Sequence, residues 1–137
     1  MMRSVFADTG YWIALTNPKD GLHCKAIAVA RQLEPCHIVT SDMVLTEVLN
    51  VFADRGPQLR NVAIQAVEAI REDARIEVVP QTRRLFQAAL DLYRKRPDKG
   101  WSLTDCASFV IMTEHKLTDS LTHDGHFEQN GFTALLR

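Results

Sequence analysis

Short runs of apolar and β-branched residues alternate along this chain with longer segments in which apolar residues recur every three or four positions. The short runs predict buried strands, and the longer segments predict amphipathic helices. We expect strands at residues 3–7, 37–40, 75–79, 118–122 and 132–135. We expect helices at residues 9–16, 22–33, 42–54, 58–72, 82–95 and 103–115, with Ser41 as an N-cap.

Strands and helices alternate almost throughout, which favours an α/β fold with a mainly parallel central sheet. Such a sheet is covered by helices on both faces, giving three α/β/α layers. The length of 137 residues is expected to form a single domain, residues 1–137, with one core. Ligands in such folds bind beyond the carboxyl ends of the strands, so polar residues at those ends are the first candidates for a functional site.

The composition is that of an ordinary soluble protein, with 46% hydrophobic and 24% charged residues. A formal net charge of -1 means that any nucleic-acid binding would need a local basic surface. The three cysteines, Cys24, Cys36 and Cys106, show no CxxC spacing and are expected to be reduced thiols. No membrane span or secretory signal is evident, so we expect a cytoplasmic protein without a membrane partner.

Four carboxylates occupy positions where an isolated acid is awkward. Asp8 and Asp124 each end a strand-like run, Asp105 opens a helix, and Glu47 lies among apolar helical positions. Acids brought together by a fold repel one another and cost stability unless a cation neutralises them. Carboxylate oxygens suit hard divalent cations, and such ions serve phosphate chemistry. The four acids therefore predict a Mg²⁺ or Mn²⁺ site.

Each acid also has an ordinary structural explanation. Asp8 can cap the helix that begins at the next residue, and Asp105 can complete a capping box with Ser102. Asp124 can begin a turn with Gly125. Asp119, by contrast, starts a strand and is expected at the opposite edge of the sheet.

Glu47 is the hardest acid to explain structurally. At helical spacing its neighbours are Met43, Val44 and Val51, so it is expected to project from a largely buried stripe. An unpaired buried carboxylate would cost roughly several kcal/mol. The sequence offers no evident arginine partner, which favours a metal.

Two further groups have less specific signals. His123 and His126 flank Asp124, but an oxygen-rich metal site does not require histidine, so surface or loop-packing roles are expected for both. A basic loop precedes the helix that carries Asp105, and it would usually be solvated. Its position makes four residues the best candidates for RNA phosphate contacts: Arg94, Lys95, Arg96 and Lys99.

Four segments, in order and at fitting separations, together resemble one family. They are residues 5–10 (VFADTG), 46–49 (TEVL), 102–109 (SLTDCASF) and 121–127 (LTHDGHF), the last followed by Gly131-Phe132. The set resembles the PIN-domain family, specifically the VapC-like ribonuclease toxins of bacterial toxin–antitoxin pairs. Each motif alone is weak, whereas the ordered set spans nearly the whole chain.

The resemblance implies a metal-dependent endoribonuclease with four catalytic and metal-binding acids: Asp8, Glu47, Asp105 and Asp124. Asp8 and Asp105 would hold the principal Mg²⁺ or Mn²⁺, and the other two acids would complete the pocket. Thr9 and Thr122 would support it by hydrogen bonds. Water activated by the metal would leave a 5′-phosphate and a 3′-hydroxyl. The implied partners are RNA, a small antitoxin protein and a second copy of the chain.

Other interpretations remain open at this point. A housekeeping RNA-processing nuclease, or a non-catalytic RNA-binding or interaction domain, could share the same fold. A haloacid-dehalogenase-type phosphatase would need an acid two residues after Asp8, where Gly10 stands. Gly10 also replaces a serine that is frequent in the PIN-domain motif. A P-loop NTPase is excluded because the sequence lacks GxxxxGK[ST].

Overall fold

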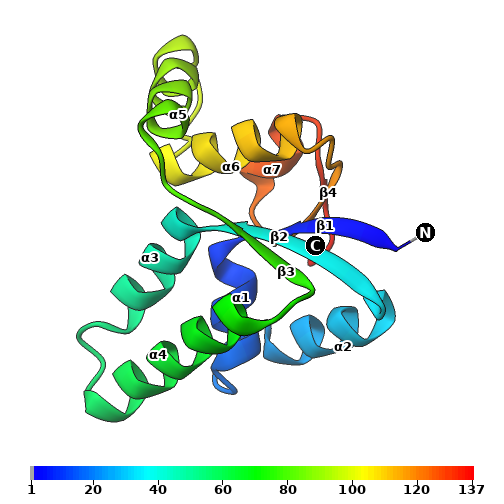
Figure 1. Cartoon of the computed structure of the whole chain (residues 1–137), viewed down its shortest axis with the longest axis vertical. Coiled ribbons are helices and arrows are strands. Elements are labelled where there is room, and N and C mark those ends of the chain that lie inside the picture. Colours follow the sequence, from blue (N-terminus) through cyan, green and yellow to red (C-terminus); the bar gives the residue numbers. More distant parts are fainter. Residues whose placement is uncertain (1) are drawn as a thin grey trace.

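The protein is described here by a computed structural model that covers residues 2–137, built around one five-stranded sheet (Figure 1). The strands are β1 (Arg3–Ala7), β2 (Cys36–Ser41), β3 (Ile76–Val79), β4 (Asp119–Leu121) and β5 (Thr133–Ala134). Their order across the sheet is β3-β2-β1-β4-β5, and every neighbouring pair is parallel. The α/β class and the mainly parallel sheet are confirmed.

Helices fill the connections between the strands. They are α1 (Thr9–Thr16), α2 (His23–Leu33), α3 (Asp42–Phe52), α4 (Pro57–Glu72), α5 (Arg83–Lys95), α6 (Leu103–Glu114) and α7 (Gly125–Gln129). Figure 1 shows α1 to α4 on one side of the sheet and α5 to α7 on the other, which confirms the three layers. No helix within residues 2–137 is both long and apolar enough to cross a membrane.

The observed bounds of the strands and helices agree closely with those expected from the sequence, except that α7 was not expected. Ser41 caps α3 as expected, since its Oγ accepts a hydrogen bond from the backbone N–H of Val44 at 3.1 Å. Residues 125–129 were not expected to be helical, because five residues are too few to display a helical period. The side chain of Asp124 caps this short helix by accepting the His126 backbone N–H at 2.9 Å.

The strand order places a topological switch between β1 and β4. From β1 the chain moves through β2 to β3 in one direction, and it then returns to add β4 on the other side of β1. The helices that follow β1 and β4 consequently lie on opposite faces of the sheet (Figure 1). Parallel α/β sheets bind their ligands in the crevice at such a point, beyond the carboxyl ends of the strands.

An aromatic cluster anchors the layer formed by α6 and α7. Phe109 of α6 packs edge-on against Phe127 of α7 and against Trp101, with ring centroids 4.9 Å apart in both pairs. All three side chains are buried. Truncating a buried phenylalanine to alanine typically costs about 3–5 kcal/mol. These contacts therefore fix the two helices that position Asp105 and Asp124.

Candidate metal centre

The four predicted acids line one pocket at the carboxyl ends of β1 and β4. Its volume is about 430 Å³, and its walls include Asp8, Glu47, Asp105 and Asp124. The expected convergence is therefore observed, although the acids span most of the sequence. Asp119 lies apart, as expected, and forms an ion pair with Arg3 near the amino ends of the strands at 2.7 Å.

Asp8 sits at the centre of the switch point. It directly follows β1, and its backbone N–H donates to the carbonyl of Leu121 in β4 at 3.2 Å. Its side chain does not cap α1; instead, the hydroxyl of Thr122 donates to Asp8 Oδ2 at 2.9 Å. The capping explanation for this side chain is thus not supported by the geometry.

Burial shifts the pKa of the Asp8 carboxyl from 3.8 to about 7. Removal from water is the largest cause, because it disfavours the charged form. Hydrogen bonds from the Thr9 backbone and the Thr122 side chain oppose the shift, while the charges of Asp105 and Asp124 reinforce it. In the absence of a cation, the pocket therefore resists full ionisation of its acids.

Asp105 combines the two roles that its sequence position suggested. Its Oδ2 accepts the backbone N–H of Ser102 at 3.0 Å, and its own N–H donates to Ser102 Oγ at 3.0 Å, which completes a capping box. Burial raises the pKa of its carboxyl, partly opposed by Ser102 and His126, and the nearby Asp124 raises it further. The contacts of the carboxylate with the Ser102 N–H and with His126 both involve Oδ2, so Oδ1 remains available to a ligand in the pocket.

Glu47 enters the pocket from α3 and is held there by Thr9. The Thr9 hydroxyl donates to Glu47 Oε1 at 2.8 Å, across two elements far apart in sequence. Of the stripe from which Glu47 was expected to project, Val44 is buried, whereas Met43, Val51 and Glu47 itself are half-buried. The side chain opens onto the pocket, where water and Thr9 can solvate it.

Thr122 organises the segment that carries Asp124. Besides donating to Asp8, its hydroxyl accepts the backbone N–H of Asp124 at 3.0 Å. One buried side chain thus connects an acid at the end of β1 with an acid after β4. The hydrogen bonds of Thr9 and Thr122 agree with the supporting roles predicted for them. Their roles in function stay predictions.

His126 is the residue that sequence reasoning undervalued. Its ring Nδ1 lies 3.0 Å from Asp105 Oδ2 and 3.4 Å from Asp124 Oδ1, inside the same pocket. Sequence analysis favoured a surface or loop-packing role for this histidine, whereas its ring lines the acid pocket. The sequence did not predict α7, and the helix that starts after Asp124 is what turns the side chain of His126 back toward the acids.

The residues of the pocket fit a hard divalent cation. Across residues 2–137, no lysine or arginine forms an ion pair with any of the four acids. Ligand atoms of Asp105, Asp124 and His126 lie within 4.8 Å of one another, close enough to share an ion. Carboxylate oxygens with one imidazole suit Mn²⁺ or Mg²⁺ far better than a soft metal.

The basic loop lies beside the acid pocket. A groove of about 560 Å³ is lined by Arg94, Arg96 and Lys99, and Gly100 lines both this groove and the acid pocket. Arg96 lies over the ring of Trp101, 5.3 Å from its centroid. The adjacency agrees with the predicted position of this loop. Contact of the loop, including Lys95, with RNA stays a prediction.

Comparison with known proteins identifies the fold family. The family model of the PIN domain matches residues 5–132. This chain belongs to the PIN-domain family. It is 28% identical over 131 residues to the 23S rRNA-specific endonuclease VapC20 of Mycobacterium tuberculosis, covering 96% of this chain and 97% of that protein. The PIN-domain resemblance drawn from the four motifs is confirmed.

A solved structure supports the same relationship. The crystal structure of Mycobacterium tuberculosis VapC20, described as a sarcin–ricin loop cleaving toxin, superposes with a TM-score of 0.85 at 27% sequence identity. The match covers 94% of this chain and 96% of that one. The likeness to VapC toxins therefore extends over both sequence and fold.

Proposed function

We propose that this PIN-domain protein is a divalent-metal-dependent endoribonuclease of the VapC type, and that it is the toxin of a toxin–antitoxin pair. The observation that carries the proposal is the convergence of Asp8, Glu47, Asp105 and Asp124 at the switch point of the sheet, where no lysine or arginine within residues 2–137 forms an ion pair with them. The similarity to VapC20 over nearly the whole chain supports both parts.

The acids would share the work of holding the ion and placing the substrate. Asp8 and Asp105 are the proposed principal ligands, while Glu47 and Asp124 complete the pocket. Thr9 and Thr122 hold two of these carboxylates in position. When bound, Mg²⁺ or Mn²⁺ supplies an acidic water and neutralises charge on the phosphate. Attack by water on phosphorus would break the P–O3′ bond; the leaving 3′-oxygen would take up a proton, which gives the proposed 5′-phosphate and 3′-hydroxyl ends.

The proposed substrate is RNA, and a structured ribosomal RNA loop is the first to test. VapC20 is named for 23S rRNA and for the sarcin–ricin loop. The groove beside the pocket would supply Arg94, Arg96 and Lys99 for phosphate contacts. An RNA backbone crossing this groove reaches the acids past Gly100, where a side chain would narrow the passage.

A small antitoxin and a cytoplasmic setting complete the proposal. The anionic pocket can accept an arginine or lysine from a flexible antitoxin segment that folds on binding. The free thiols Cys24, Cys36 and Cys106 agree with a reducing compartment. A housekeeping RNA-processing nuclease with the same chemistry would not need such an antitoxin.

We also propose that the protein forms a homodimer. Phe86 and Tyr93 are 45% and 52% exposed, and their seven-residue spacing places them on the same face of α5. Large exposed aromatic residues on one helix are typical of protein contacts. A two-fold pairing is the commonest closed assembly. Analytical ultracentrifugation of the wild type and of Phe86→Glu would test this.

Incubation of purified protein with RNA tests the nuclease directly. Ribosomal RNA and a sarcin–ricin loop oligonucleotide should be cut in Mn²⁺, and EDTA should stop the reaction. Mapping both ends of the products should give a 5′-phosphate and a 3′-hydroxyl. Intact RNA in every metal tested would refute the enzymatic function and favour an RNA-binding domain.

Induced expression tests the toxin role separately. Expression of the wild type should arrest growth, and Asp105→Ala should not. Co-expression of a small neighbouring antitoxin should relieve the arrest and yield a purifiable complex. Efficient RNA cleavage without growth arrest would favour the housekeeping nuclease.

A further inference from the structure

The imidazole of His126 occupies a position that the four acids alone do not explain. Nδ1 lies 3.0 Å from Asp105 Oδ2 and 3.4 Å from Asp124 Oδ1, so the ring joins two acids from two different elements. Its ring is partly exposed, with 33% of the side chain accessible, and borders the pocket. The side chain is thus accessible to an ion that enters from solvent.

The backbone around His126 fixes the direction from which its ring enters the pocket. His126 is the second residue of α7, and its N–H is held by Asp124 Oδ1 at 2.9 Å. The next residue, Phe127, is fully buried and packs against Phe109. Buried packing on one side and a cap on the other therefore set the direction in which the ring projects.

Nδ1 can contribute to the site in two opposite ways. As a hydrogen-bond donor, it would partly neutralise Asp105 in the metal-free protein and would compete with an ion for the carboxylate. As a ligand, it would present its lone pair to the ion while the ring proton sits on Nε2. A Cβ atom built at Gly100 would lie 3.9 Å from Nε2, at ordinary van der Waals distance.

We propose that His126 is a direct nitrogen ligand of the metal, together with Asp105 and Asp124, and that it biases the pocket toward Mn²⁺ over Mg²⁺. The inference rests on the metal site of the proposed function. The three ligand atoms lie within 4.8 Å of one another, which is the spacing that a shared ion requires. As a transition-metal ion, Mn²⁺ accepts an imidazole nitrogen more readily than Mg²⁺ does, since Mg²⁺ takes oxygen ligands and retains its waters.

Measurements of metal binding without RNA distinguish a ligand role of His126 from a role as hydrogen-bond donor to Asp105. Calorimetry with MnCl₂ and MgCl₂ should show Mn²⁺ affinity falling about tenfold or more in His126→Ala, comparable with the loss of other ligand-shell contacts, and Mg²⁺ affinity changing much less. His126→Asn places an amide oxygen near the position of Nδ1 and should recover Mg²⁺ binding more fully than Mn²⁺ binding. His115→Gln, at the far end of α6, should bind both ions as the wild type does.

A spectroscopic readout identifies the nitrogen itself. Electron spin-echo modulation of bound Mn²⁺ should show coupling to ¹⁴N in the wild type and in His115→Gln, and this coupling should disappear in His126→Ala and His126→Asn. Circular dichroism would confirm that the variants are folded.

The outcomes distinguish this inference from the proposed function. Unchanged Mn²⁺ binding in His126→Ala would show that the ring is not a ligand, and tighter binding would show that it competes with the ion. Either result would overturn the inference while leaving the nuclease intact. Absence of Mn²⁺ binding in the wild type would overturn it as well. Loss of ¹⁴N coupling with weaker Mn²⁺ binding would support it even if the wild type cut no RNA.

Discussion

The two ends of the sheet treat acidic side chains in opposite ways. Near the amino ends of the strands, Asp119 pairs with Arg3 at 2.7 Å, and Glu77 lies 3.1 Å from His115. The side chains of Glu77 and Arg3 are each 49% exposed. At the carboxyl ends, Asp8 is buried and pairs with no lysine or arginine within residues 2–137.

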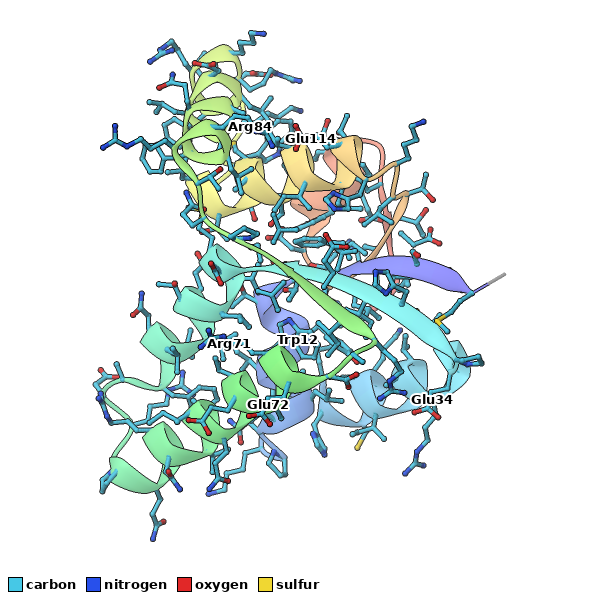
Figure 2. All side chains as sticks on the ribbon, in the orientation of Figure 1. Trp12, Glu34, Arg71, Glu72, Arg84 and Glu114 are labelled. Atoms are coloured by element: carbon cyan, nitrogen blue, oxygen red, sulfur yellow. The ribbon has the colours of Figure 1, made fainter. Side chains whose placement is uncertain are left out.

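Acids on the outer helices are paired with basic residues, as they are near the amino ends of the strands. Arg84 of α5 and Glu114 of α6 pair at 2.8 Å and lie close together on the surface (Figure 2). Exposed pairs of this kind contribute about 0–1 kcal/mol, and water screens each partner. An acid that is buried without a basic partner has no such relief. The difference indicates that the pocket acids are placed for a ligand rather than for stability.

The largest expected effect is on RNA cleavage. Asp8→Ala or Asp105→Ala should reduce the cleavage rate by about a hundredfold or more, because stabilisation of charge by the ion is lost. Asp119→Ala, at the amino end, is the matched control and should cleave at nearly the wild-type rate. Single-turnover assays with Mn²⁺ measure the effect. Equal losses in Asp8→Ala and Asp119→Ala would remove the distinction between the two ends.

Thermal stabilisation by metal should depend on the pocket acids and should not depend on Asp119. At a Mn²⁺ concentration about 100 times the dissociation constant, binding stabilises the folded state by about 2.7 kcal/mol. Asp8→Asn and Asp105→Asn should lose most of that gain, whereas Asp119→Asn should keep it. Melting curves with and without Mn²⁺ provide the measurement. An undiminished shift in both pocket variants would place the ion elsewhere.

The metal-free protein should show the burial penalty as a pH dependence. The pKa of Asp8 is about 7 in the folded state and 3.8 as the reference value, so the folded protein retains a proton that the unfolded chain releases. The contribution of Asp8 to the stability of the metal-free protein should therefore fall as pH rises from about 4 to 7. Relative to wild type, Asp8→Asn should gain on the order of 1–3 kcal/mol between pH 5 and pH 8.

Urea unfolding in EDTA at pH 5 and pH 8 measures this difference. The amide oxygen that Asp8→Asn introduces would still accept a hydrogen bond from Thr122, so the comparison isolates the charge. Asp119→Asn, whose partner is exposed Arg3, serves as the control and should show no such gain. A variant that loses stability relative to wild type as pH rises would contradict the assigned direction of the Asp8 pKa shift.

The smallest effect is expected at the amino end itself. Arg3→Ala should change the free energy of unfolding by less than about 1 kcal/mol, because its ion pair with Asp119 is solvated. The small loss should diminish further in about 1 M salt. Denaturant titrations at two ionic strengths measure it. A loss of several kcal/mol would mean that acids at both ends of the sheet are structurally important.

Local patterns alone determined much of this protein. Alternating strands and helices implied a parallel sheet, and that in turn placed Asp8 and Asp124 near one edge, because carboxyl ends of parallel strands share a side. Ser41 and Ser102 were recognisable caps, since their hydrogen bonds reach only three residues along the chain. Four ordered motifs then led to the PIN-domain family.

The tertiary structure decided the features that depend on contacts between distant residues. The strand order put β4 beside β1, which brought Thr122 to Asp8 across most of the sequence. Glu47 is half-buried and lines the pocket together with Thr9 and Gly10 of α1, which no periodicity within α3 encodes. The placement of His126 against Asp105 needed the short helix α7 and the buried Phe127 behind it. Periodicity reports which side of an element is buried, whereas only packing decides which polar groups meet.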